Sequence, residues 1–143
     1  MKSLLFWLAS AVLTPALANP LTDLRWQHRP LLVFAPSHEA APYQALTQYL
    51  MDRQAALLER DMVVLHLFPT AGRLDDQPLA GEDVAALRRH FAVADAEFRA
   101  VLVGKDGGQK GRWSEADILD QVFALIDTMP MRRREMRSNA HSP

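Results

Sequence analysis

The sequence predicts a single α/β domain whose mixed sheet is covered by helices on both faces. Two short apolar runs, at residues 31–35 and 62–68, have the length and continuous hydrophobicity of strands buried on both faces. A helical pattern separates these runs, and a crossover of this kind makes the two strands parallel. Farther along the chain, Asp106-Gly107-Gly108 predicts a tight hairpin, which must join antiparallel neighbours.

Prolines and helical spacing define the first half of the domain. Pro30 and Pro36 bound the first apolar run, and Pro69 ends the second. A helix is expected from about Pro42, because the missing N–H of proline is not needed at a first helical position. Its apolar positions recur at helical spacing and form one face, made of Tyr43, Leu46, Leu50, Met51, Leu57 and Leu58.

The second half continues with a loop, a short helix and a hairpin. Residues 70–81 are predicted to be a loop, and residues 82–91 a helix. The helix has acidic residues in its first turn and basic residues in its last, which suits its dipole. Strands are expected at residues 99–104 and 109–113, on either side of the glycine turn.

The last helix is predicted to start with a capping box of Ser114 and Asp117. Pro130 should end or kink this helix. We expect the domain to occupy residues 19–137 and residues 138–143 to form a disordered tail. The resulting order, β-α-β-α-β-β-α, is the plan of the thioredoxin fold.

Residues 1–18 have the pattern of a cleavable export signal. Lys2 supplies a positive start, an apolar run follows at residues 4–13, and small residues end the stretch at Ala18. The run is too short to cross a bilayer, which needs about 20 apolar residues in a helix. We therefore expect an exported chain that starts near Asn19, keeps no transmembrane anchor, and works in the periplasm or outside the cell.

Composition excludes several functions. The formal net charge is −1, so the chain has no general attraction for nucleic acid, and no nucleic-acid partner is expected. The sequence contains no cysteine. Thiol–disulfide exchange, thiol peroxidase chemistry and cysteine-ligated metals all need that sulfur atom and are excluded. The five histidines have no i, i+4 pair, so neither a metal site nor a cofactor is predicted.

Four stretches carry a resemblance to a known family: RWQHRPLLVFAPS, ERDMVVLHL, AVLVGKDGGQK and FALIDTMPMRRREMR, at residues 25–37, 59–67, 100–110 and 123–137. In these stretches the sequence resembles a thioredoxin-like family known as domain of unknown function 4174. It implies a thioredoxin-like fold, export and no established reaction. Redox-active thioredoxins carry a cysteine pair at the first helix and a cis-proline near the position of residues 96–98. This chain has neither feature.

The turn of Ser37, His38 and Glu39 is the first candidate binding site. It leads into a helix N-terminus, whose free N–H groups and positive dipole end attract acidic groups. One alternative is a thiol-independent, hydrolase-like enzyme that uses these three side chains. Adjacent residues point in different directions, however, and a catalytic triad is assembled from separated segments. The other alternative is a solvated turn in which Ser37 caps backbone groups.

The basic segment near the C-terminus is the second candidate. Its arginines are Arg132, Arg133, Arg134 and Arg137. One interpretation is a docking strip for an acidic partner or for anionic lipid headgroups, with the neighbouring methionines as apolar contacts. The other is that these arginines form only the basic end of a helix. We also expect a structural, partly buried ion pair between Arg29 and Asp61, which precede the two parallel strands.

These observations favour a non-catalytic binding module of the cell envelope that contacts a protein or another envelope component. An enzyme is the less favoured alternative, because no spaced set of nucleophile, base and orienting group is visible in the sequence. The pattern specifies no oligomeric state.

Overall fold

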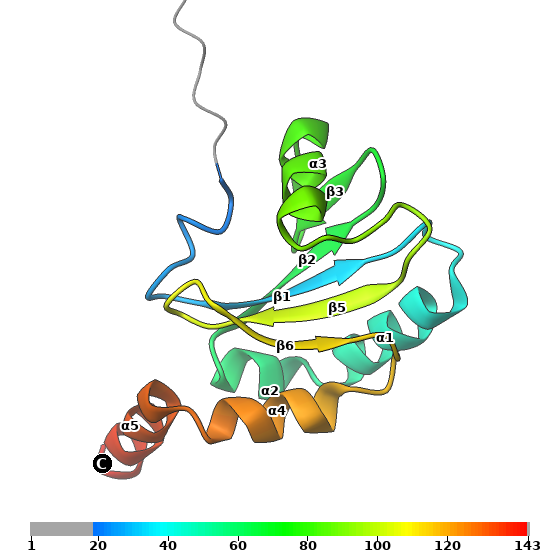
Figure 1. Ribbon diagram of the computed structural model, residues 1–143. Coiled ribbons are helices and arrows are strands. Elements are labelled where there is room, and N and C mark those ends of the chain that lie inside the picture. Colours follow the sequence, from blue (N-terminus) through cyan, green and yellow to red (C-terminus); the bar gives the residue numbers. More distant parts are fainter. Residues whose placement is uncertain (1–18, 143) are drawn as a thin grey trace, which may run out of the picture.

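The structure is a computed structural model that describes residues 19–142. The predicted export signal at residues 1–18 lies outside the described residues. The rest forms one mixed sheet with helices on both faces, which confirms the expected fold class (Figure 1).

Six strands form the sheet in the order β4-β3-β2-β1-β5-β6. They are β1 (Arg29–Phe34), β2 (Met62–Leu67), β3 (Gly72–Leu74), β4 (Gln77–Leu79), β5 (Arg99–Val103) and β6 (Gln109–Trp113). The central pair β1–β2 is parallel, and β1 pairs with β5 antiparallel on its other side. The hairpin β5–β6 is antiparallel, as the glycine turn predicted.

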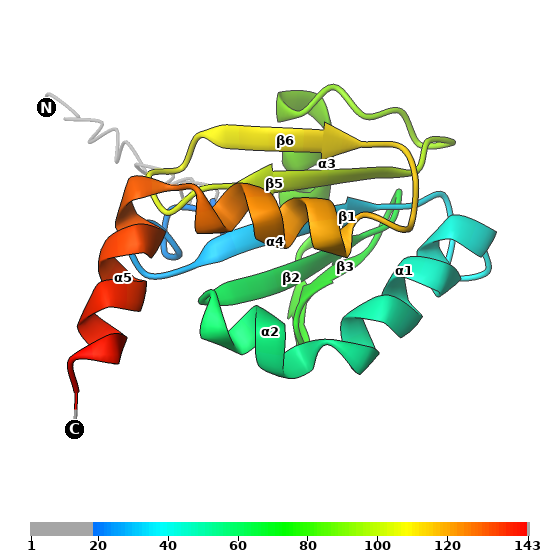
Figure 2. The ribbon, with the colours of Figure 1, turned by 90° about the horizontal axis from the view of Figure 1, so that it is seen from below.

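Helices cover both faces of this sheet. They are α1 (Ala41–Asp52), α2 (Gln54–Glu59), α3 (Gly81–His90), α4 (Leu119–Asp127) and α5 (Pro130–Ala140). Figures 1 and 2 show α3 on one face, α1, α2 and α4 on the other, and α5 at one end of the sheet.

Successive side chains of β1 point to opposite faces of the sheet and therefore belong to two separate hydrophobic clusters. Leu31 and Val33 pack with residues of α1, α2 and α4. Leu32 and Phe34 pack with residues of α3. All four side chains are fully buried, which explains the continuous apolar run in the sequence.

The prediction of a loop at residues 70–81 was wrong. This segment contains the hairpin β3–β4, in which Asp75 adopts a positive φ of 48° at the turn. Aspartate tolerates this left-handed conformation better than most residues. The two strands are three residues each, too short for alternation to be recognised in the sequence.

The predicted single helix after β1 is interrupted at Arg53, which separates α1 from α2. Leu50 and Leu57 are buried on both sides of the interruption, as their spacing predicted. Met51 and Leu58, each one position farther along, were expected to widen the buried face but are 61% and 74% exposed, so the buried stripe is narrower than predicted.

The predicted capping box at the start of α4 does not form. The N-cap of α4 is Ile118 without a side-chain cap, and the Ser114 hydroxyl donates a hydrogen bond to Glu115. Pro130 opens α5 near its first helical position, as a residue without an N–H can. Helix α5 continues to Ala140, so three residues assigned to the disordered tail are helical.

Candidate functional site

The turn between β1 and α1 places an exposed histidine against an aromatic cluster. The His38 ring stacks on Phe68 with 3.8 Å between the centroids, and it meets the edge of Tyr43 at 6.1 Å. Within residues 19–142, no hydrogen bond joins the side chains of Ser37, His38 and Glu39. The N-cap of α1 is Ala40, and Ser37 provides no side-chain cap there.

Beneath this turn lies a second, buried histidine. His66 of β2 is hydrogen-bonded through Nδ1 to the Tyr43 hydroxyl at 2.9 Å, as expected for a core histidine satisfied by a neighbour. Burial lowers the pKa of His66 to about 4, with smaller contributions from Arg73 and His38. His66 is therefore neutral at pH 7. The sequence does not predict that His38, Tyr43, His66 and Phe68 form one cluster, because they come from three separate segments.

A buried arginine binds backbone carbonyls at the same end of the central strands. Arg88 of α3 donates hydrogen bonds to the carbonyl oxygens of Ala35 and Leu67 at 3.0 and 3.2 Å, and to that of Ala94 at 2.9 Å. Ala35 follows β1, Leu67 ends β2 and Ala94 lies in the loop before β5. The carbonyls of Leu67 and Ala94 also accept the backbone N–H groups of Ala35 and Glu97, so Arg88 ties segments that are already hydrogen-bonded. The sequence indicates only that basic residues in the last turn of this helix suit its dipole, and Arg88 is one of them. Helical spacing does not reveal carbonyl acceptors on other segments.

The basic segment divides into one anchor and three exposed arginines. Arg132 is only 1% exposed, and it pairs with Glu59 at 2.7 Å and with Asp127 at 3.1 Å. Its assignment to a docking strip is therefore corrected, because its guanidinium is already bound within the domain. Arg133, Arg134 and Arg137 are exposed, and no carboxylate in the described part of the chain lies within 4 Å of them.

The expected Arg29–Asp61 ion pair is replaced by an indirect link. The backbone N–H of Arg29 donates to the Asp61 carbonyl at 2.9 Å, while its guanidinium binds Glu135 of α5 at 3.1 Å. Asp61 instead pairs with Lys105 at 2.8 Å, and Lys105 also binds Glu135 at 2.7 Å. The direct pair was wrong because α5, which the sequence does not place, brings a third carboxylate to these residues.

Two carboxylates of this network titrate below their ordinary range. Burial opposes ionisation of Glu135, but hydrogen bonds from Arg29 and Lys105 outweigh it and lower its pKa. Burial likewise opposes ionisation of Asp127, and hydrogen bonds from Arg60 and Arg132 lower its pKa overall. Both groups are therefore charged at neutral pH and hold α5 to the domain.

All four stretches that suggested the family resemblance contribute to this ion network. They supply Arg29, then Glu59, Arg60 and Asp61, then Lys105, and finally Asp127, Arg132 and Glu135. The network lies at the N-terminal ends of β1 and β2, opposite the His38 turn. The chain therefore has two distinct ends, and its most specific sequence motifs meet at the α5 end.

The remaining structural predictions concern the β5–β6 turn. Gly107 has a φ of +87°, which favours glycine, and Asp106 accepts a hydrogen bond from the Gly108 N–H at 2.9 Å.

Residues 19–142 contain no group of three or more histidine, aspartate or glutamate side chains suited to a metal ion. No helix in this part of the chain is long and apolar enough to cross a membrane.

Curated relatives match most of this chain but only a small part of their own length. Coiled-coil domain-containing protein 80 of Danio rerio is 33% identical over 142 residues, which covers 85% of this chain and 16% of that protein. Sushi repeat-containing protein SRPX of Homo sapiens is 31% identical over 124 residues, covering 83% of this chain and 27% of that protein. The chain thus corresponds to one portion of much longer proteins.

Solved structures show the same fold at low sequence identity. Thioredoxin peroxidase I of Plasmodium yoelii has a TM-score of 0.60 at 15% identity, covering 80% of this chain and 79% of that one. Peroxidoxin BcpB of Mycobacterium tuberculosis has a TM-score of 0.59 at 12% identity, and the match covers 76% of this chain and 84% of that one. At these identities the likeness shows the fold alone, which is thioredoxin-like.

A family match covers nearly the whole described structure. The sequence model of the family described as domain of unknown function (DUF4174) matches residues 20–135, which end at the Glu135 carboxylate that anchors α5. The protein belongs to the DUF4174 family.

Proposed function

We propose that this domain is an exported, non-catalytic binding module that contacts an acidic protein surface through the outer face of α5. One observation carries the proposal: partly buried ion pairs of Arg132 and Glu135 hold α5 against the domain, while Arg133, Arg134 and Arg137 project from it and have no carboxylate partner among residues 19–142. The proposal of export rests on the signal pattern at residues 1–18.

The exposed face combines charge with an apolar contact. Arg133 and Arg137 are one helical turn apart, and they line a shallow surface depression of about 380 Å³ with Met136, which is 36% exposed. Arginine forms two parallel hydrogen bonds with a carboxylate, and methionine adapts to irregular apolar surfaces. This chemistry suits a partner that presents carboxylates around a small apolar residue.

The hydrolase-like alternative receives no support from the turn geometry. His38 is stacked on Phe68 and has no hydrogen bond to Ser37 or Glu39. A nucleophile and its base must lie within hydrogen-bonding reach of each other. Binding therefore accounts better for the observed arrangement than catalysis by these three residues.

In-cell crosslinking followed by mass spectrometry tests the proposal. Replacing Arg133, Arg134 and Arg137 by Ser should abolish recovery of a protein partner and change the unfolding free energy by only about 0.5 kcal/mol, because these side chains are exposed. Arg132 stays in place because it anchors the helix. A control in which Arg53, Arg89 and Lys110 become Ser removes the same charge elsewhere and should retain the partner.

Equal recovery by the wild type and the α5 variant would refute this surface. Equal losses in the α5 variant and its control would show that general charge, not α5, governs recovery. Crosslinks only to lipid or polysaccharide would contradict a protein partner.

A further inference from the structure

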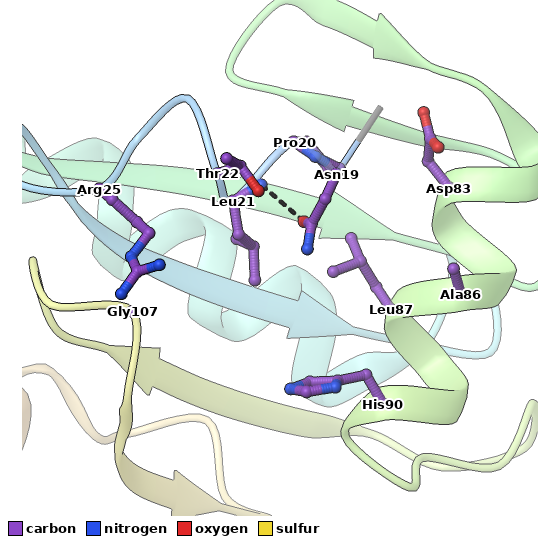
Figure 3. A pocket seen from close by; sticks show the side chains of 10 residues that line it. All are labelled: Asn19, Pro20, Leu21, Thr22, Arg25, Asp83, Ala86, Leu87, His90 and Gly107. Carbon is purple, nitrogen blue, oxygen red and sulfur yellow. Dashed lines mark hydrogen bonds between the residues drawn. The ribbon is translucent and has the colours of Figure 1, made fainter. Parts of the chain in front are cut away.

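A cavity on the α3 side of the sheet has the properties of a small-ligand site. Its volume is about 420 Å³, within the range of ligand pockets, and it lies between α3 and the N-terminal segment (Figure 3). It is formed by different elements from the α5 surface. An inference about it therefore does not depend on the α5 surface.

One wall is a single face of α3 with a carboxylate near its first turn and an imidazole in its last turn. Asp83, Ala86, Leu87 and His90 line the cavity at i, i+3, i+4 and i+7 spacing. Asp83 is in the first turn and His90 in the last, so the backbone rises about 10 Å between them. Ala86 and Leu87 make the middle of this wall apolar.

The opposite wall adds the exposed cation of Arg25 and a second apolar contact. Arg25 donates a hydrogen bond to the Asp106 carbonyl at 2.9 Å, and Leu21 reaches the centre of the cavity (Figure 3). A Cβ atom at Gly107 would lie 3.0 Å from Arg25 Nε. The glycine therefore leaves the space that the guanidinium occupies. In Figure 3, Asp83 lies at one end of the cavity, away from Arg25 and His90.

The polar side chains at the two ends of the α3 wall have no partners within residues 19–142. Within the described chain, neither the Asp83 carboxylate nor the His90 imidazole has a side-chain hydrogen bond or an ion pair. A ligand that satisfies both ends must carry a positive group near Asp83 and a negative group near Arg25 and His90. Its middle must be able to lie against Leu21 and Leu87.

We propose that this cavity binds a short zwitterionic peptide of about three residues. The ammonium group lies at Asp83, the carboxylate lies at Arg25 and His90, and small apolar side chains contact Leu21 and Leu87. Three extended residues span about 10 Å, which matches the rise from Asp83 to His90. A single amino acid is too short to reach both ends.

Calorimetric titration of the purified protein with tri-alanine tests this proposal. Tri-alanine should bind, while N-acetyl-tri-alanine amide, which lacks both charges, should bind at least about tenfold more weakly. Asp83→Asn should weaken tri-alanine binding by a similar factor. The matched control is Glu82→Gln, which removes a neighbouring acidic charge from the same helical turn but does not line the cavity.

Two further variants test the carboxylate end. Arg25→Gln and His90→Gln should each weaken binding of tri-alanine, whereas Arg89→Gln, on the same helix but outside the cavity, should not. Absence of tri-alanine binding at millimolar concentration would overturn the proposal. Equal binding of the blocked peptide, or equal affinities of the Asp83→Asn and Glu82→Gln variants, would also overturn it.

Discussion

His66 shows how one buried side chain couples the fold to pH. Its ring is enclosed beneath α1, bonded to Tyr43, with Arg73 opposite on β3 and His38 above. These surroundings favour the neutral imidazole. Its pKa of about 4 in the folded state lies well below the ordinary value of 6.5.

The stability of the domain should therefore fall as the pH is lowered from 6.5 to 4. In this window the unfolded chain binds a proton at His66 that the folded chain does not bind, so acidification favours unfolding by up to about 3 kcal/mol. Urea unfolding at several pH values measures this. His66→Asn should flatten the dependence, whereas His141→Asn, at an exposed site, should not. An NMR titration that gives His66 a pKa near 6.5 would contradict the prediction.

Helix α5 illustrates an element whose orientation depends on ion pairs. Few of its side chains are apolar and buried, and its fully buried side chain is Arg132. Asp127 and Glu135 have lowered pKa values, so their pairs stabilise the docked helix at neutral pH. That contribution is lost as the pH falls below about 4.5 and the carboxylates become protonated.

Arg132 and Arg133 should differ sharply although they are adjacent. Arg132→Met should destabilise the domain by about 2 kcal/mol at pH 7, because it removes the hydrogen bonds that the buried guanidinium makes to Glu59 and Asp127. Arg133→Met should change stability by about 0.5 kcal/mol or less. Urea unfolding gives both values, and hydrogen exchange over residues 130–140 should accelerate only in the Arg132 variant. Equal effects would show that α5 is not anchored by Arg132.

The whole molecule combines a thioredoxin-like fold with a sequence that lacks cysteine. The turn between β1 and α1 carries Ser37, His38 and Glu39 and has no cysteine. Stability therefore comes from the two hydrophobic clusters and the α5 ion network, without disulfides.

The purified protein should show no thiol-dependent chemistry. We expect no reduction of hydrogen peroxide or of insulin disulfides above the rate of dithiothreitol alone, because no residue can form the thiolate that attacks either substrate. For the same reason, dithiothreitol should leave the thermal unfolding midpoint unchanged. Catalytic turnover of either substrate by the protein would contradict a binding role for this scaffold.

Much of the fold is predictable from local patterns, and much of the site is not. The central strands are visible because Leu31 and Leu65 lie in continuous apolar runs, and a helix starting near Pro42 follows from proline geometry. The hairpin β3–β4 escaped prediction because its strands are so short. Arg132 could not be distinguished from Arg133, because burial depends on which residues of other segments surround each side chain.

The sequence by itself determined the fold class, the parallel central strands and the absence of thiol chemistry, since these depend on local apolar spacing and residue composition. Only the tertiary structure decided that Glu135 bridges Arg29 and Lys105, and that Arg25, Asp83 and His90 line one cavity. The physical reason is distance along the chain. Hydrophobic periodicity acts over neighbouring residues, whereas ion pairs and cavities join residues that only folding brings together.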